Sequence, residues 1–233
     1  MALATPLSIE SQPAKKHEFF ARKGVNFWQR IFAGMNEIRV PSPDGLHAIV
    51  AERKDDGEML VHVLVRGKRI DTYIGSQVNC EVGWAPDSKA FFVTYSEGGL
   101  VGFYSVDVYY IESSRLRVLR TGKHVEKDYW VWMKPIACGW PDGPNIVAIK
   151  WIEDSSRLLV AAQIPPHSVC DSFGTFKVYE IALPDARIVK RYEQIEAKKL
   201  FWQDMGFELR AANDECIRNP KSCQIAGNHQ KKP

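Results

Sequence analysis

The sequence predicts an all-β fold built from repeated four-stranded antiparallel units. Short apolar runs rich in Val, Ile, Phe and Tyr recur from Glu37 onward. In many of these runs apolar and polar residues alternate, which favours a strand with one buried face over a helix. Gly, Asp, Asn and Pro separate the runs and supply the backbone angles that tight turns require.

Four such runs form a unit over residues 37–75, and the same succession recurs over 78–120 and, less regularly, over 145–196. In each unit an aspartate-bearing turn joins the first run to the second. These turns contain Asp44, Asp87 and Asp154. Four antiparallel strands repeated every forty to fifty residues are typical of β-propeller blades, and a β-sandwich of consecutive hairpins is the alternative. We therefore expect an incomplete β-propeller-like array of about three blades.

The turn sequences also resemble a known repeat. "SPDG" at Ser42–Gly45 and "WAPDSK" at Trp84–Lys89 are similar to the W-S-P-D-G-K repeat of TolB-like propellers, which look related to WD-repeat blades. "WIEDSSR" at Trp151–Arg157 keeps the Trp, Asp and Ser but lacks the Pro and Gly. The resemblance covers residues 37–196. It implies blades that form interaction surfaces or an accessory domain of a peptidase, with a structural role for the motif itself.

Residues 1–36 and 197–233 flank the repeats in what we expect to be one globular domain, since a chain of 233 residues can bury about 70% of its unfolded surface. Apolar residues at roughly helical spacing predict a short N-terminal helical cap, with a partner-binding or membrane-surface segment as the alternative. These residues are Phe20, Phe27, Trp28, Ile31 and Phe32. The C-terminal segment allows a strand of a degenerate fourth blade or a short helix, followed by an irregular basic tail.

The long connections between strands predict where binding occurs. Because consecutive strands are antiparallel, the aspartate turns share one end of the array, and the connections 121–145 and 165–174 emerge at the other end. Long loops on a rigid β scaffold commonly carry binding residues. The alternative is that "YWVWM" forms a fragment of strand and core. The candidate binding residues are His124, Tyr129, Trp130, Trp132, Trp140, His167 and Asp171.

No complete catalytic or metal-binding motif is present in the sequence. We therefore expect a non-enzymatic protein-interaction or binding module without a catalytic residue, a metal site or a cofactor. One alternative is an accessory β domain that guides substrate to a larger enzyme system. Another is a small Cys/His-dependent hydrolase that uses His124, His167 and Cys170.

The composition limits the class of partner. A net charge of +3 with interspersed acids and bases predicts no basic stripe and no nucleic-acid partner. No apolar run is long enough for a transmembrane segment. We expect a protein partner, an extended peptide or a glycan, and two identical arrays pairing into a closed ring are a further option.

The cysteines and the N-terminal residues bear on the compartment. Cys216 and Cys223 flank a turn sequence and suit a short-loop disulfide, with two separate thiols as the alternative. The remaining cysteines lack zinc-site spacing. The first residues contain no intact signal peptide but resemble the region around a cleavage site. We expect a periplasmic or secreted protein whose signal peptide has been removed, with a cytoplasmic location as the alternative.

Overall fold

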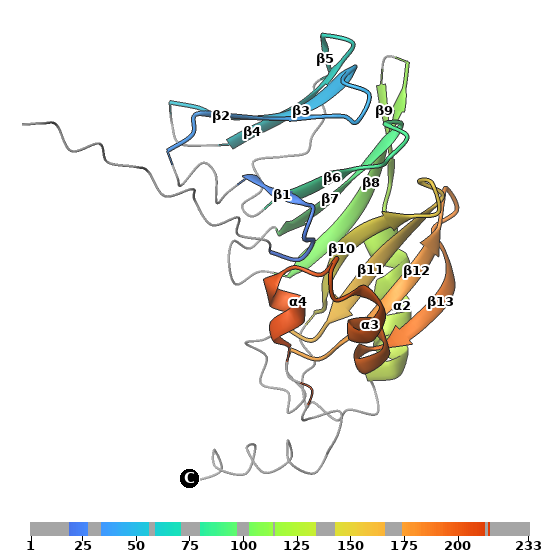
Figure 1. Ribbon diagram of the computed structural model, residues 1–233. Helices are drawn as coiled ribbons and strands as arrows, with labels where there is room; N and C mark the ends of the chain where they lie inside the picture. Colours follow the sequence, from blue (N-terminus) through green and yellow to red (C-terminus); the bar gives the residue numbers. More distant parts are fainter. Residues whose placement is uncertain are drawn as a thin grey trace, which may run out of the picture.

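The computed structural model describes residues 19–27, 34–55, 59–70, 80–96, 103–113, 115–133, 143–165, 174–212 and 214. Over these residues the chain is mostly β and contains three antiparallel sheets (Figure 1). The prediction of an all-β fold is therefore confirmed. Among the helices in this part of the chain, none is both long and apolar enough to cross a membrane.

The strands follow the predicted runs, with their order in each sheet matching their order in the chain. Sheet 1 contains β2 (Glu37–Pro41), β3 (His47–Arg53), β4 (Met59–Val65) and β5 (Lys68–Ile70). Sheet 2 contains β6 (Glu81–Trp84), β7 (Ala90–Ser96), β8 (Tyr104–Glu112) and β9 (Arg115–Leu119). Sheet 3 contains β10 (Asn145–Ile152), β11 (Arg157–Gln163), β12 (Phe176–Ala182) and β13 (Arg187–Glu193).

The turn between β4 and β5 shows how the sequence sets the strand register. Val65 pairs with Lys68, so only Arg66 and Gly67 form the loop. Their φ angles are 49° and 77°. Positive φ at both central residues is the geometry of a type I′ hairpin turn, whose twist matches that of the flanking strands.

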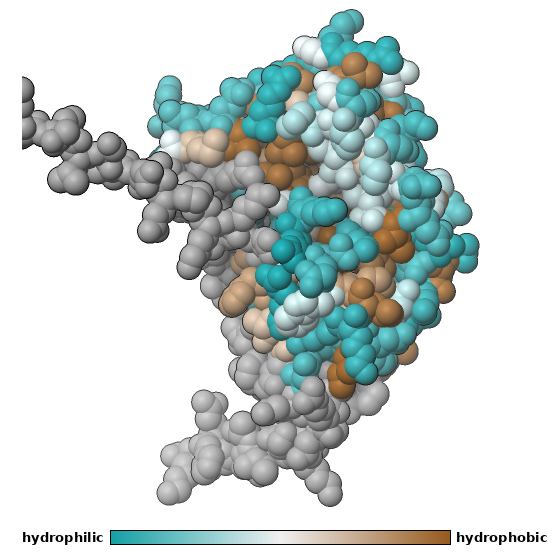
Figure 2. Space-filling view, in the orientation of Figure 1, coloured by the Kyte–Doolittle hydropathy of each residue, from teal (hydrophilic) through white to brown (hydrophobic). Residues whose placement is uncertain are grey.

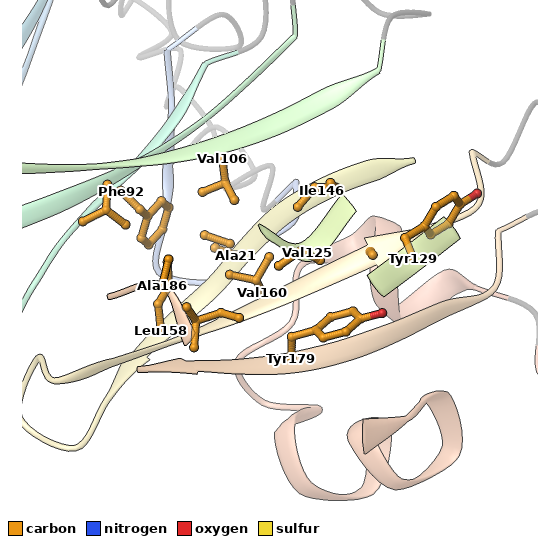
Figure 3. Close-up of a cluster of buried hydrophobic side chains, with 14 of the residues drawn as sticks. Ala21, Phe92, Val106, Val125, Tyr129, Ile146, Leu158, Val160, Tyr179 and Ala186 are labelled. Carbon is orange, nitrogen blue, oxygen red and sulfur yellow. The ribbon is translucent and has the colours of Figure 1, made fainter. Parts of the chain in front are cut away.

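The three sheets stack with their faces toward one another. Alternate residues of β4, from Met59 to Val65, point toward sheet 2, where they meet Val82, Phe91 and Val93 in one core. Sheet 2 contributes its opposite face to a second core shared with sheet 3. In Figure 3, Phe92 and Val106 of sheet 2 lie opposite Leu158 and Val160 of sheet 3. Sheet 2 is therefore buried on both faces.

The N-terminal segment ties sheet 2 to the C-terminal part of the chain. Its strand β1 (Val25–Asn26) pairs with β6 as a short fifth strand of sheet 2, and Ala21 forms a bridge with Met205. The buried Glu81 side chain accepts hydrogen bonds from the backbone N–H groups of Phe20 and Ala21, each at 3.2 Å. The predicted helix is therefore wrong for residues 19–26, because these backbone groups bond to other segments. The rest of the predicted cap, 28–33, lies outside the described residues.

Two helices, α3 (Gln194–Phe201) and α4 (Phe207–Ala211), cover the face of sheet 3 that points away from sheet 2 (Figure 1). Their buried Ala197 and Leu209 pack against Val147 and Val178 of the sheet. The strand of a fourth blade that the sequence allowed here is absent from the described residues 197–212, and the alternative of a short helix is present as α4. Met205, Leu209 and Ala212 are buried at helical spacing, which the alternation of Phe207, Leu209 and Ala211 concealed.

Candidate interaction surface

The aspartates of the first two predicted turns stabilise those turns. Asp44 accepts hydrogen bonds from the Ser42 hydroxyl at 2.6 Å and from the Leu46 backbone N–H at 3.0 Å. These two bonds lower the pKa of Asp44. Asp87 accepts from the Lys89 backbone N–H at 3.0 Å. Both carboxylates therefore act as local turn caps.

The same turns also join each sheet to the one before it. The backbone N–H of Asp44 donates to the Ser88 hydroxyl at 3.0 Å, and that of Asp87 donates to the Ser155 hydroxyl at 3.1 Å. Ser88 and Ser155 each follow the aspartate of their own turn. The turn serine of one sheet thus binds the turn aspartate of the preceding sheet, in both interfaces.

A second hydrogen bond between sheets also recurs at both interfaces. The indole N–H of Trp84 donates to the Val40 carbonyl oxygen at 2.9 Å, and that of Trp151 donates to the Gly83 carbonyl oxygen at 3.1 Å. Each tryptophan lies three residues before the aspartate of its own turn. The motif that set the repeat in the sequence therefore carries the contacts between sheets.

Sheet 1 lacks both groups, because Pro41 and Gly45 occupy the positions of the tryptophan and the serine. A further sheet preceding sheet 1 would therefore receive neither of the two hydrogen bonds. At the other end of the stack, α3 and α4 cover the face of sheet 3 where a following sheet would pack.

The long connections lie at the end of the stack opposite the aspartate turns, as the sequence predicts. Asn145 pairs with Gln163, and Gln163 pairs with Phe176, so the chain enters β10, leaves β11 and enters β12 at one end. Phe103 precedes β8 at this end and is 49% exposed. A Cβ atom at Gly143 would lie 3.1 Å from the Phe103 ring. The connection between β7 and β8 therefore contacts the one between α2 and β10 at this point.

The first long connection begins as a helix, α2 (Thr121–Met133), which packs between sheets 2 and 3. Gly122 allows the close approach, since a Cβ there would lie 2.5 Å from the Ser105 hydroxyl oxygen. Val125 and Tyr129 enter the core beside Val160 and Tyr179 (Figure 3). The alternative that "YWVWM" forms a strand is therefore wrong, because these residues end α2. The same alternative placed the segment in the core, which is correct for Tyr129.

The candidate binding residues are consequently divided. Tyr129 is fully buried, Trp130 is half-buried against the core, and His124 is exposed on α2. Trp132 lies in α2, but its side chain is outside the described part of the structure. Trp140, His167, Asp171, Cys216 and Cys223 also lie outside the described residues, as does Cys170 of the hydrolase alternative.

An ion pair fixes the exposed side of α2. Arg191 of β13 donates to both oxygens of Asp128, with its Nη2–Oδ1 distance at 2.6 Å and its Nε–Oδ2 distance at 3.1 Å. The bond from Arg191 lowers the pKa of Asp128. Helix α2 is thus held on one side by Tyr129 in the core and on another by a bidentate pair.

Asp107 and Cys80 are two further buried ionisable residues. Asp107 is buried beside the Tyr95 hydroxyl at 3.2 Å and the Arg120 guanidinium at 3.7 Å, and burial raises its pKa. The Cys80 thiol is fully buried, which raises its pKa and disfavours a thiolate nucleophile. Within the described ranges, no group of three or more His, Cys, Asp or Glu side chains is placed to hold a metal ion.

Helix α2 also carries a basic surface that sequence reasoning missed. Lys123, His124 and Lys127 are exposed on the helix, and Arg120 immediately precedes it. Charge averaged over the chain did not show this local cluster, which also includes Glu126 and Asp128. Counting charges at helical spacing over 120–127 would have found it.

The surface in Figure 2 is mostly hydrophilic, and its hydrophobic residues form separate patches. The face drawn in Figure 2 therefore shows no single large apolar area among the described residues. The chain matches no protein-family model. No curated protein shows significant sequence similarity to it.

Proposed function

We propose that this chain is a non-enzymatic protein-interaction module built on propeller-type blades, with the long-connection end as its binding surface. The proposal rests on the two kinds of hydrogen bond that recur between the sheets. Trp84 and Trp151 donate one kind, and Ser88 and Ser155 accept the other. Such bonds, together with two apolar cores, hold the sheets as a rigid support. Binding residues on loops benefit from a rigid support, because less conformational freedom is lost when a partner binds.

The resemblance of the turns to TolB-like repeats supports the same role, since blades of that family commonly form interaction surfaces. Pairing of two arrays into a ring gains no support, because Pro41 and Gly45 cannot repeat the bonds between sheets. The covered face of sheet 3 is a second obstacle to ring closure. The proposed partner is therefore a different protein, an extended peptide or a glycan.

Exposed phenylalanines at two places allow a matched test. Phe103 lies at the long-connection end, whereas Phe207 lies on α4 and is 62% exposed. We expect Phe103→Ala to reduce the amount of partner captured from the native host by the immobilised chain, with little change in Tm. Phe207→Ala, which removes the same side chain elsewhere, should leave capture unchanged. Equal capture by both variants would contradict a binding surface at the long-connection end.

A further inference from the structure

We propose that the exposed face of α2 binds an acidic amphipathic helix of a partner protein. This surface, which we name the α2 basic face, consists of Arg120, Lys123, His124, Lys127 and Val131. The inference rests on the proposed interaction role and specifies the chemistry of the partner.

The charges of α2 oppose the stability of the helix itself. The positive end of a helix dipole lies at its N-terminus and favours acidic residues there, with basic residues favoured at the C-terminus. The first turn of α2 contains no acidic residue, and its last turn contains no basic one. The cationic Lys123 instead lies in the first turn. Folding of the helix therefore does not explain this arrangement.

Nearby acidic groups compensate the basic side chains only in part. Asp107 interacts electrostatically with Arg120 and Lys123, and Glu126 lies three residues after Lys123 on the helix. Lys123 and Lys127 are four residues apart, a spacing at which like charges repel on a helix surface. No ion pair within 4.0 Å joins either of them to an acidic residue of the described chain. Arg120 contacts Asp107 only at 3.7 Å, and its side chain remains 63% exposed. An acidic partner would relieve this repulsion.

An apolar residue continues the same line along the helix. Val131 follows Lys127 by four residues and is 71% exposed, and the half-buried Trp130 lies beside it in the chain. A partner helix can match this spacing if its acidic residues recur every third or fourth residue and an apolar residue follows them. The α2 basic face is thus complementary to such a helix along its whole length.

The neighbouring acids argue against nucleic acid as the occupant. Glu126 and Asp128 flank the basic residues on the same helix. A phosphate backbone carries charge continuously along its length and would meet these carboxylates, whereas a helix can place neutral residues opposite them. The bidentate pair between Asp128 and Arg191 also keeps α2 in place, so the surface exists before the partner binds.

The test measures binding of a fluorescein-labelled helical peptide with glutamates at this spacing and leucines at its end, by fluorescence anisotropy with the full chain. We expect saturable binding that weakens with salt and is lost when glutamine replaces each glutamate. The double variant K123E/K127E should weaken binding by at least about tenfold. Its Tm and far-UV circular dichroism spectrum show whether the variant is folded.

The double variant K68E/K89E is the matched control, since it changes the net charge equally at two exposed lysines away from α2. It should bind like the unchanged chain. Equal weakening in both double variants, equal binding of the glutamine peptide, or tighter binding of single-stranded DNA than of the peptide would each overturn the proposal. The effect of Phe103→Ala on partner capture tests the proposed interaction role separately. A failure of the peptide experiment alone would contradict only the inference about α2.

Discussion

The indole N–H of Trp151 donates to the carbonyl oxygen of Gly83 at 3.1 Å, and this bond joins the first strand of sheet 3 to the first strand of sheet 2. Trp84 makes the equivalent bond to Val40 of sheet 1. Each tryptophan also packs against the core between the two sheets that it connects. One side chain thus combines apolar burial with a directional bond, which specifies how neighbouring sheets align.

Replacing Trp151 by Phe keeps an aromatic ring but removes the donor. We expect the free energy of unfolding to fall by about 1 kcal/mol or more, because the Gly83 carbonyl loses its partner and the ring becomes smaller. Urea unfolding measures the change. Trp202→Phe is the control, since Trp202 is 44% exposed at the end of α3 and should change the unfolding free energy by less than about 0.5 kcal/mol. A similar loss of unfolding free energy in both variants would show that the Trp151 hydrogen bond adds no particular stability.

Gly122→Ala should displace α2 from sheet 2. The added Cβ would lie 2.5 Å from the Ser105 hydroxyl oxygen and 3.2 Å from the Val106 backbone N and O. We expect a net loss of about 1 kcal/mol in unfolding free energy, although alanine by itself favours a helix. Adding Ser105→Ala removes the nearest atom and should restore part of the loss. A stabilising Gly122→Ala substitution would show that α2 does not require this close approach.

Asp128 should make the docking of α2 depend on pH. Its pKa is lowered by the bond from Arg191, so its contribution is present above the ordinary value of 3.8 and is lost as pH falls through the lowered value. Asp128→Asn should cost about 1 kcal/mol at neutral pH, and this difference from the unchanged chain should shrink in acid. Unfolding measured at neutral pH and at about pH 3 tests both points. Glu126→Gln is the control at neutral pH for the loss of one carboxylate from the same helix, since Arg191 pairs with Asp128.

Cys80 should be protected from thiol labelling in the native protein. Cys80 is fully buried and the pKa of its thiol is raised, so iodoacetamide should leave it unmodified in the native protein and modify it after denaturation. Counting thiols in the denatured, unreduced chain also tests the predicted disulfide. A bond between Cys216 and Cys223 leaves three of the five cysteines free, and its absence leaves five.

The strands of all three sheets could be predicted because each hairpin is specified locally. Alternation identifies the buried face of β4, and residues such as Gly67 identify the turn that follows it. The end of the stack that carries the long connections follows from antiparallel pairing alone. These features depend on neighbours in the chain, which the sequence displays directly.

Segments outside the repeats could not be predicted in the same way. "YWVWM" alternates as a strand would, yet it ends helix α2, because the gap between sheets 2 and 3 accepts Val125 and Tyr129 on one helical face. Residues 19–26 are included in the predicted N-terminal helix, but their backbone bonds to Glu81 and to the C-terminal segment. In both cases distant groups determined the local conformation.

The sequence by itself determined the repeated strands, their turns and the positions of Trp84, Trp151 and the turn serines. Only the tertiary structure decided that these residues bond one sheet to the next, that α3 and α4 cover sheet 3, and that Lys123 and Lys127 remain exposed together on α2. The physical reason is that turn geometry and alternation depend on adjacent residues, whereas burial and charge compensation depend on which distant surfaces meet.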